Sequence, residues 1–414
     1  MNTGRAKTTR RRKGCQAGFA LIVTLLLLAL LVLTVYALTT LTRIGTGLSA
    51  NAAYRTQARQ HALLGLDVAL GELQRAAGED SAITGMAGIT GITAGAGKPA
   101  RHWCGVWGAD GHFMRWLVSG VSSEVIPPLG GNDSIAVLSA GTLGADGGDK
   151  EHVRVLLVPV LINNPSGNAT RQGSYAWWVG DEGVKLSAVI PAGEAPESGR
   201  QHAINELIAA LDPTSANLAR VLAYGQLAFV PDTPLTPGPL QSNFHALGVT
   251  HRQPAGSPWV AGRFNVNSTS ARYWRGLGAT YNRLRPTAPL NLDLTTFGNR
   301  MRDNLALADS PGKAAGGPFQ TVDAFLASPL LAAALQGSEV TPEQFGDAMR
   351  AWLTTRSDTF RIRAYGEAAN PADATRVEAE AWCEAVVQRV DTGLPGFGRR
   401  YMLLQFRWLG TDDI

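Results

Sequence analysis

The stretch Phe19–Thr42 reads FALIVTLLLLALLVLTVYALTTLT and carries no charged side chain over 24 residues. As an α-helix it would be about 36 Å long, which exceeds the roughly 30 Å hydrocarbon thickness of a bilayer. No second apolar run of this length occurs in the 414-residue chain. The sequence therefore predicts a chain that crosses a membrane once, near its N-terminus.

The segment before this stretch is strongly basic. Residues 1–18 contain no acid and six cations, namely Arg5, Lys7, Arg10, Arg11, Arg12 and Lys13. They account for the net charge of +4, because the other 396 residues carry 31 Lys and Arg against 33 Asp and Glu. Cations beside an apolar segment are typical of a cytoplasmic flank. We therefore expect a cytoplasmic N-terminus, residues 43–414 outside the cytoplasm, and no nucleic-acid partner.

The same N-terminus allows three processing outcomes. The apolar helix can remain as an uncleaved anchor, or it can be a secretory signal cut after Ala37. The third outcome follows from a resemblance. Gly18-Phe19-Ala20-Leu21-Ile22, between a short basic leader and an unbroken apolar helix, resembles the prepilin leader of the type IV pilin and type II secretion pseudopilin superfamily.

The resemblance implies that a prepilin peptidase cuts between Gly18 and Phe19 and that the helix stays on the mature chain. Its first residues would then pack against helices of other subunits; they are Phe19, Leu21, Ile22, Val23 and Leu25. The family usually has a glutamate at the fifth mature position, which here is Val23. This substitution is similar to that of K-type minor pseudopilins (general secretion pathway protein K), which lie at the filament tip.

Beyond the membrane, residues 43–78 continue as an amphipathic helix. Apolar residues recur there at mostly three- and four-residue spacings, at Ala52, Ala53, Ala58, Leu63, Leu66, Leu70 and Leu73. Gly45 and Gly47 each cost about 1 kcal/mol relative to alanine in a helix, so we expect a kink or melted turn where the helix leaves the membrane.

The exported head is predicted to be α+β. Residues 79–190 contain strand signals at 153–162 and 174–190, residues 191–355 have short helical patterns, and residues 356–414 form three alternating strands. Thr341-Pro342-Glu343-Gln344 is a capping box. A long helix on an antiparallel sheet with a mostly helical insertion resembles the K-type pseudopilin plan.

Three short sequence segments, in the same order as in K-type pseudopilins, support the resemblance. They are AWWVGDEGVK (176–185), GRFNVNST (262–269) and PFQTVDAFL (318–326). Because they are polar residues in an alternating segment, Asn265 and Asn267 are expected to cap or fix a loop.

The sequence has no motif for enzyme chemistry of the kinds HExxH, CxxC, GxxxxGK or GxSxG. The seven histidines show no metal-ligand spacing. The group that comes closest to such a pattern is His102 with Asp110 and His112, and its segment is predicted to be a surface loop. Asp181-Glu182 reads as a turn. We expect no cofactor, although loop carboxylates at Asp133, Asp146 and Asp149 are candidates for calcium.

Cys104 and Cys383 are the two cysteines of the exported part. In an oxidising compartment they could form one bridge, which would close a loop of nearly 280 residues, or they could remain two separate buried thiols. The sequence leaves both alternatives open.

Two functions fit these features. The first is a non-enzymatic minor pilin or pseudopilin-like subunit of the inner membrane, with a periplasmic head, that primes or caps a type IV pilus or type II secretion-like filament. Its implied partners are other minor pilins or pseudopilins, a prepilin peptidase and an inner-membrane assembly platform. The second is an anchored or secreted envelope protein with a binding or hydrolytic head.

Overall fold

A computed structural model describes residues 16–90, 101–121, 126–144, 148, 151–163, 169–188, 207–208, 217–218, 221, 223–231, 235–249, 264–306, 317–391 and 399–414. The chain divides into two compact units, Met1–Thr56 and Gln57–Ile414. The finer segment boundaries expected at residues 78, 190 and 355 stay predictions.

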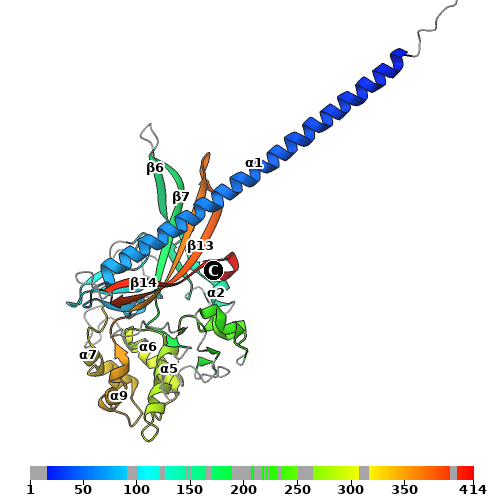
Figure 1. The fold of residues 1–414 in the computed structure, drawn as a ribbon. Helices are drawn as coiled ribbons and strands as arrows, with labels where there is room; N and C mark the ends of the chain where they lie inside the picture. Colours follow the sequence, from blue (N-terminus) through cyan, green and yellow to red (C-terminus); the bar gives the residue numbers. More distant parts are fainter. Residues whose placement is uncertain are drawn as a thin grey trace, which may run out of the picture. The chain divides into compact units, whose positions relative to one another are not determined.

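The N-terminal helix α1 spans Gln16–Ala77 (Figure 1). Its part from Phe19 onward is long and apolar enough to cross a membrane. Of the expected kink or melted turn at Gly45 and Gly47, the melted turn is wrong, because α1 is helical through both residues. Two glycines cost about 2 kcal/mol together, which the continuous hydrogen bonding of a long helix on either side can offset.

The head in the second unit is built on a five-stranded antiparallel sheet with the order β14-β13-β12-β7-β6. Its strands are β6 Val158–Asn163, β7 Ala169–Asp181, β12 Thr359–Asn370, β13 Asp373–Asp391 and β14 Arg399–Leu409. Strand β12 pairs with β7 across the whole insertion, with Ile362 opposite Val179. The predicted α+β class, with a long N-terminal helix and an antiparallel sheet, is confirmed.

The end of α1 that belongs to the second unit packs on one face of this sheet. Its buried positions are Ala58, Ala62, Leu66, Ala69, Leu73, Ala76 and Ala77. All of these except Ala58 share a core with Trp177, Ile362, Ala385 and Val387 of the strands. The approach is closest at Gly366 of β12, where a Cβ atom would lie 2.1 Å from the Ala62 nitrogen and 2.3 Å from the Ala58 oxygen. Only glycine allows the helix backbone to lie this close to the strand.

Smaller sheets extend the head. They are β1 Ile83–Met86 with β2 Cys104–Trp107 and β3 Phe113–Trp116, β4 Ser134–Leu138 with β5 Val153–Leu156, β8 Leu186–Ser187 with β9 Leu247–Gly248, and β10 Phe264–Asn265 with β11 Leu353–Thr354. The first of these joins the main sheet because Leu117 donates to Cys104 and accepts from Val179.

The segment between β8 and β12 carries most of the short helices. They are η4 Tyr224–Phe229, α4 Pro237–Ser242, α5 Ala271–Leu284, α6 Leu294–Leu305, α7 Val322–Leu326, α8 Pro329–Ala334, α9 Pro342–Met349 and η5 Arg350–Trp352. Elsewhere lie η1 Ala87–Thr90, η2 Gly131–Asp133, α2 Ala140–Leu143 and η6 Thr411–Asp413. Helices α5, α6, α7 and α9 gather together in Figure 1. They pack in the larger of the two apolar cores, apart from the core under α1.

Local polar groups fix this insertion. Thr341 accepts from the Gln344 backbone at 3.2 Å while the Gln344 side chain accepts from the Thr341 backbone at 3.0 Å, so the predicted capping box is confirmed. Buried Asn267 binds both backbone groups of Phe319, and buried Asn265 donates to Thr84 and Ser357. The asparagines therefore hold distant loops together, as expected.

Candidate functional site

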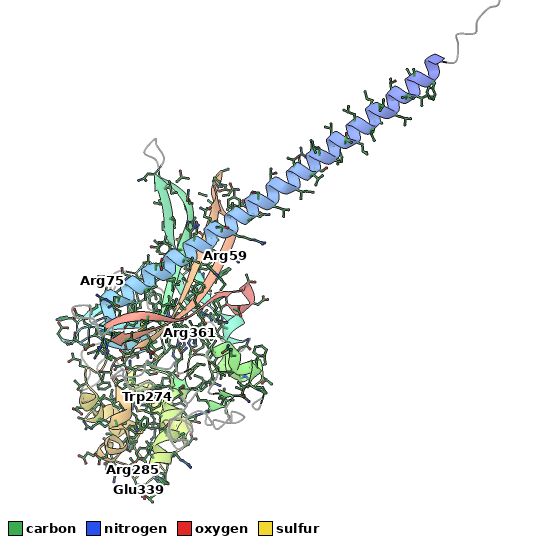
Figure 2. All side chains as sticks on the ribbon, viewed as in Figure 1. Arg59, Arg75, Trp274, Arg285, Glu339 and Arg361 are labelled. Atoms are coloured by element: carbon green, nitrogen blue, oxygen red, sulfur yellow. The ribbon has the colours of Figure 1, made fainter. Side chains whose placement is uncertain are left out.

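The predicted subunit-interface residues lie in the first described turns of α1. Phe19, Leu21, Ile22 and Leu25 are all more than half exposed within the chain, and Val23 is 37 % exposed. Exposed large apolar side chains continue along the helix as far as Leu48 (Figure 2). An apolar surface of this length needs a cover of lipid or of other apolar helices. The cut between Gly18 and Phe19 stays a prediction.

Threonine hydroxyls in this part of α1 form hydrogen bonds within the helix. The hydroxyls of Thr24 and Thr34 donate to the carbonyls of Leu21 and Leu31, and Thr39, Thr40 and Thr42 make the same kind of bond. A polar group in the hydrocarbon region needs its hydrogen-bond partner within the protein, because no water is present there. The threonines are therefore compatible with an apolar surrounding.

A second exposed apolar surface lies on β14, an edge strand of the main sheet. Its large exposed side chains are Met402, Leu403, Leu404, Phe406 and Trp408. The Arg59 guanidinium of α1 lies 5.4 Å from the centre of the Trp408 ring, which brings this strand edge beside the helix. Apolar edge strands are typical sites of protein contact.

The head also contains a buried ion-pair network on β12, β13 and β14. Glu384 accepts from Arg361 at 2.7 Å, Arg363 at 2.8 Å and Arg407 at 2.9 Å. Glu182 accepts from Arg361 and Lys185, both at 2.8 Å. Figure 2 shows Arg361 inside the head. Two carboxylates thus pair with four cations, and the direct pairing of every group gives the geometry of a structural network.

Asp181 is the last residue of β7, and the predicted turn follows it at Glu182 and Gly183. The Oδ1 atom of Asp181 accepts from the Gly183 backbone at 2.7 Å. Burial raises the pKa of Asp181 to about 6. Burial also acts to raise the pKa of Glu182, but Arg361 and Lys185 outweigh it and lower that pKa to about 2.

A compact group of metal-type ligands unites His102, Glu151 and His245. His102 Nε2 lies 2.6 Å from Glu151 Oε2, and His245 Nε2 lies 3.0 Å from the Glu151 backbone oxygen. The two imidazoles stack with centres 3.4 Å apart. One ligand atom from each residue lies within 4.8 Å of the others.

Electrostatics keep this group in a defined protonation state. Burial lowers the pKa of His102 despite the neighbouring Glu151, and burial lowers the pKa of His245 further. The hydrogen bond from His102 lowers the pKa of Glu151 to about 2. Both rings are thus neutral and the carboxylate is charged at neutral pH.

The predicted surroundings of His102 were wrong. His112 and Asp110 form an exposed pair whose atoms are 4.0 Å apart, whereas His102 contacts Glu151 and His245. These partners are 49 and 143 residues away in sequence, so no short spacing could indicate them. Each of the three residues stands two positions before a strand, namely β2, β5 or β9.

The calcium candidates stay predictions. Asp133 ends η2 and is exposed, and it belongs to no group of three ligands among the described residues. Asp146 and Asp149 lie outside the described residues.

The two exported cysteines are free and buried. Two separate buried thiols are the second of the alternatives that the sequence leaves open. Hydrogen bonding leads from Cys104 to Leu117, β7, β12 and finally Cys383 on β13. The two cysteines thus lie on strands that are not neighbours in the sheet order.

Comparisons with known proteins give one solved structure to report. It is the GspK-GspI-GspJ complex of the Type 2 Secretion System from enterotoxigenic Escherichia coli. The matched chain is 15% identical, with a TM-score of 0.35, and the match covers 61% of this chain and 84% of that chain. No family model matches this chain, and no curated protein sequence matches it.

Proposed function

We propose that this chain is a membrane-anchored, non-enzymatic minor pilin or pseudopilin-like subunit that primes or caps a filament of the type IV pilus or type II secretion kind. The observation that carries the proposal is α1, whose exposed apolar part starts at Phe19 and whose other end packs on an antiparallel sheet. One continuous helix thus provides both a membrane segment and the base of the head.

The apolar residue at Val23 supports a place at the end of a filament. An ionised carboxylate at membrane depth costs about 2.5 to 3.5 kcal/mol unless a partner charge meets it. Val23 needs no such partner. A subunit that has no neighbour ahead of it can therefore stay in the bilayer without this cost.

The β14 edge supports contact with other subunits. It exposes Phe406 and Trp408 beside α1, where a neighbouring head or helix would cover them. In the proposed role the partners are other minor pilins or pseudopilins, with a prepilin peptidase and an inner-membrane platform acting on the chain before assembly. The N-terminus would be cytoplasmic and the head periplasmic.

The pairing of the buried charges supports a role without catalysis. Each carboxylate of the network pairs with at least two cations, which stabilise its charged form and make it a weak base. The alternative of an envelope protein with a hydrolytic head would need a free nucleophile and base close together.

The experiment that tests the role labels the chain on filaments sheared from the cells that make it. An epitope tag after Ile414 is detected by immunogold electron microscopy. We expect gold at filament ends, and fewer filaments when the chain is deleted. Label along the whole filament would indicate a major subunit, and an unchanged filament number in the deletion strain would contradict a priming role.

A further inference from the structure

We propose that His102, Glu151 and His245 bind one divalent transition-metal ion of the zinc class. Two imidazole nitrogens and one carboxylate oxygen form the donor set. Zinc accepts this combination, whereas calcium and magnesium prefer oxygen ligands only. The inference is independent of the proposed filament role.

The hydrogen bonds indicate which atoms would bind the ion. His245 Nε2 donates to the backbone oxygen of Glu151, which leaves its Nδ1 lone pair available. A bond from a ring nitrogen to a backbone carbonyl is the usual support of a metal-bound histidine. His102 Nε2 and Glu151 Oε2, now 2.6 Å apart, would separate to hold the ion between them.

Ion binding needs two local changes. The proton of His102 moves from Nε2 to Nδ1, so the ring stays neutral and no net proton is released. Because the rings are stacked and parallel within 4°, one ring must also turn about its Cβ–Cγ bond before both lone pairs point at one ion. His102 is the ring that turns, because ion binding already replaces its bond to Glu151 Oε2, whereas the bond from His245 Nε2 to the Glu151 backbone oxygen holds His245 in place.

The surroundings leave one carboxylate oxygen for the ion. Arg101 Nη1 binds the other oxygen, Oε1, at 3.2 Å, which fixes the carboxylate plane. Arg101 and Lys185 both add positive potential at the histidines, which opposes a dication. Lys185 is itself paired with Glu182 at 2.8 Å. We therefore expect weaker affinity than in a site with several carboxylates.

The ion would tie together three parts of the head. His102 leads into β2, Glu151 into β5, and His245 into β9, which pairs with β8 after the β7 turn. The loop that holds His245 also presents Phe244 to Lys185, Arg361 and Arg363. A bound ion would thus fasten the start of the insertion to the sheets and raise the free energy of unfolding.

The test uses the full chain in detergent, stripped with EDTA and then given ZnCl₂ or, separately, CaCl₂. We expect about one zinc per chain after gel filtration, a higher Tm with zinc and no change in Tm with calcium. Co²⁺ in place of zinc should give visible absorption of the intensity typical of four-coordinate nitrogen and oxygen ligation. Absence of both the zinc and this absorption in the wild type would overturn the proposal.

Variants identify the ligands. H245A and E151Q should each lower the zinc content to a small fraction of the wild-type value, and H112A, which removes an exposed histidine outside the group, should leave it unchanged. Circular dichroism checks that each variant is folded. Zinc retained by folded H245A and E151Q, or lost in H112A, would overturn the assignment; if a variant does not fold, the Co²⁺ spectrum of the wild type decides.

Discussion

At the scale of single residues, Asp181 and Glu182 show how neighbouring carboxylates acquire opposite properties. Both are buried, but Glu182 meets Arg361 and Lys185, whereas Asp181 meets backbone and hydroxyl groups. Burial without a cation favours the protonated acid, and burial with two cations favours the anion. The adjacent residues therefore titrate in separate pH ranges.

This difference predicts a pH dependence of stability. The pKa of Asp181 is about 6 in the folded chain against the usual 3.8, so the folded state holds a proton that the unfolded state releases first. The free energy of unfolding should fall by about 3 kcal/mol as pH rises from about 4 to about 6, and it should change little from this group above that.

The variant D181N mimics the protonated acid and should lack this fall. Thermal unfolding of both proteins in detergent at pH 4.5, 5.5 and 7 measures the difference. Identical pH profiles of the wild type and D181N would contradict the explanation. Glu182 contributes in the opposite direction, since its lowered pKa gives stability above about 4.5 that is lost as pH falls toward 2.

At the scale of elements, the contact of α1 with β12 depends on a missing side chain. A Cβ atom at Gly366 would overlap the backbone of Ala58 and Ala62, which cannot move without shifting the helix. Nothing lies within 4 Å of a Cβ built at Gly71 in the same helix. The packing of α1 on β12 therefore requires glycine at position 366, whereas it places no such requirement on position 71.

We expect G366A to destabilise the head by at least 1 to 3 kcal/mol, because the overlap involves backbone atoms. The matched variant G71A should be neutral or raise stability by up to about 1 kcal/mol, since alanine is the better helix former. Thermal unfolding of the two variants checks both values. Equal stability of G366A and the wild type would mean that α1 does not lie on β12 as described.

At the scale of the whole molecule, Glu384 connects the sheet to the parts around it. It pairs with Arg361 and Arg363, which lie over the Phe244 ring of the insertion, and Arg363 also donates to the Val137 carbonyl. Removing the carboxylate leaves three arginine charges with too few partners inside the head.

We therefore expect E384Q to cost about 3 to 5 kcal/mol, as is usual when one partner of a buried ion pair is removed. A surface control is E343Q, which alters an exposed residue in the first turn of α9. The variants are compared by urea unfolding. If E384Q lowers the free energy of unfolding no more than E343Q does, the network contributes little to stability.

The sequence predicts those features of the whole molecule that depend on local pattern. The apolar stretch from Phe19, the Thr341 capping box and the alternating strands after residue 356 all follow from spacing along the chain. Contacts between distant segments do not. His245 reaches His102 only because β9 and β2 are brought together in the fold, and the separation of Cys104 from Cys383 depends on the strand order. The helix α1 continues through Gly45 because it is long. The helix-propensity cost of a single glycine does not include this effect of length.

The most direct test of the central claim is the intact mass of the chain recovered from membranes. The account predicts a mature chain that begins at Phe19 and keeps its apolar helix. G18L should block this cut, whereas A37L should leave it unchanged. A start at Leu38 would contradict the account and indicate a secreted protein, and an intact Met1 in the wild type would leave a plain signal anchor that is not processed as a pilin.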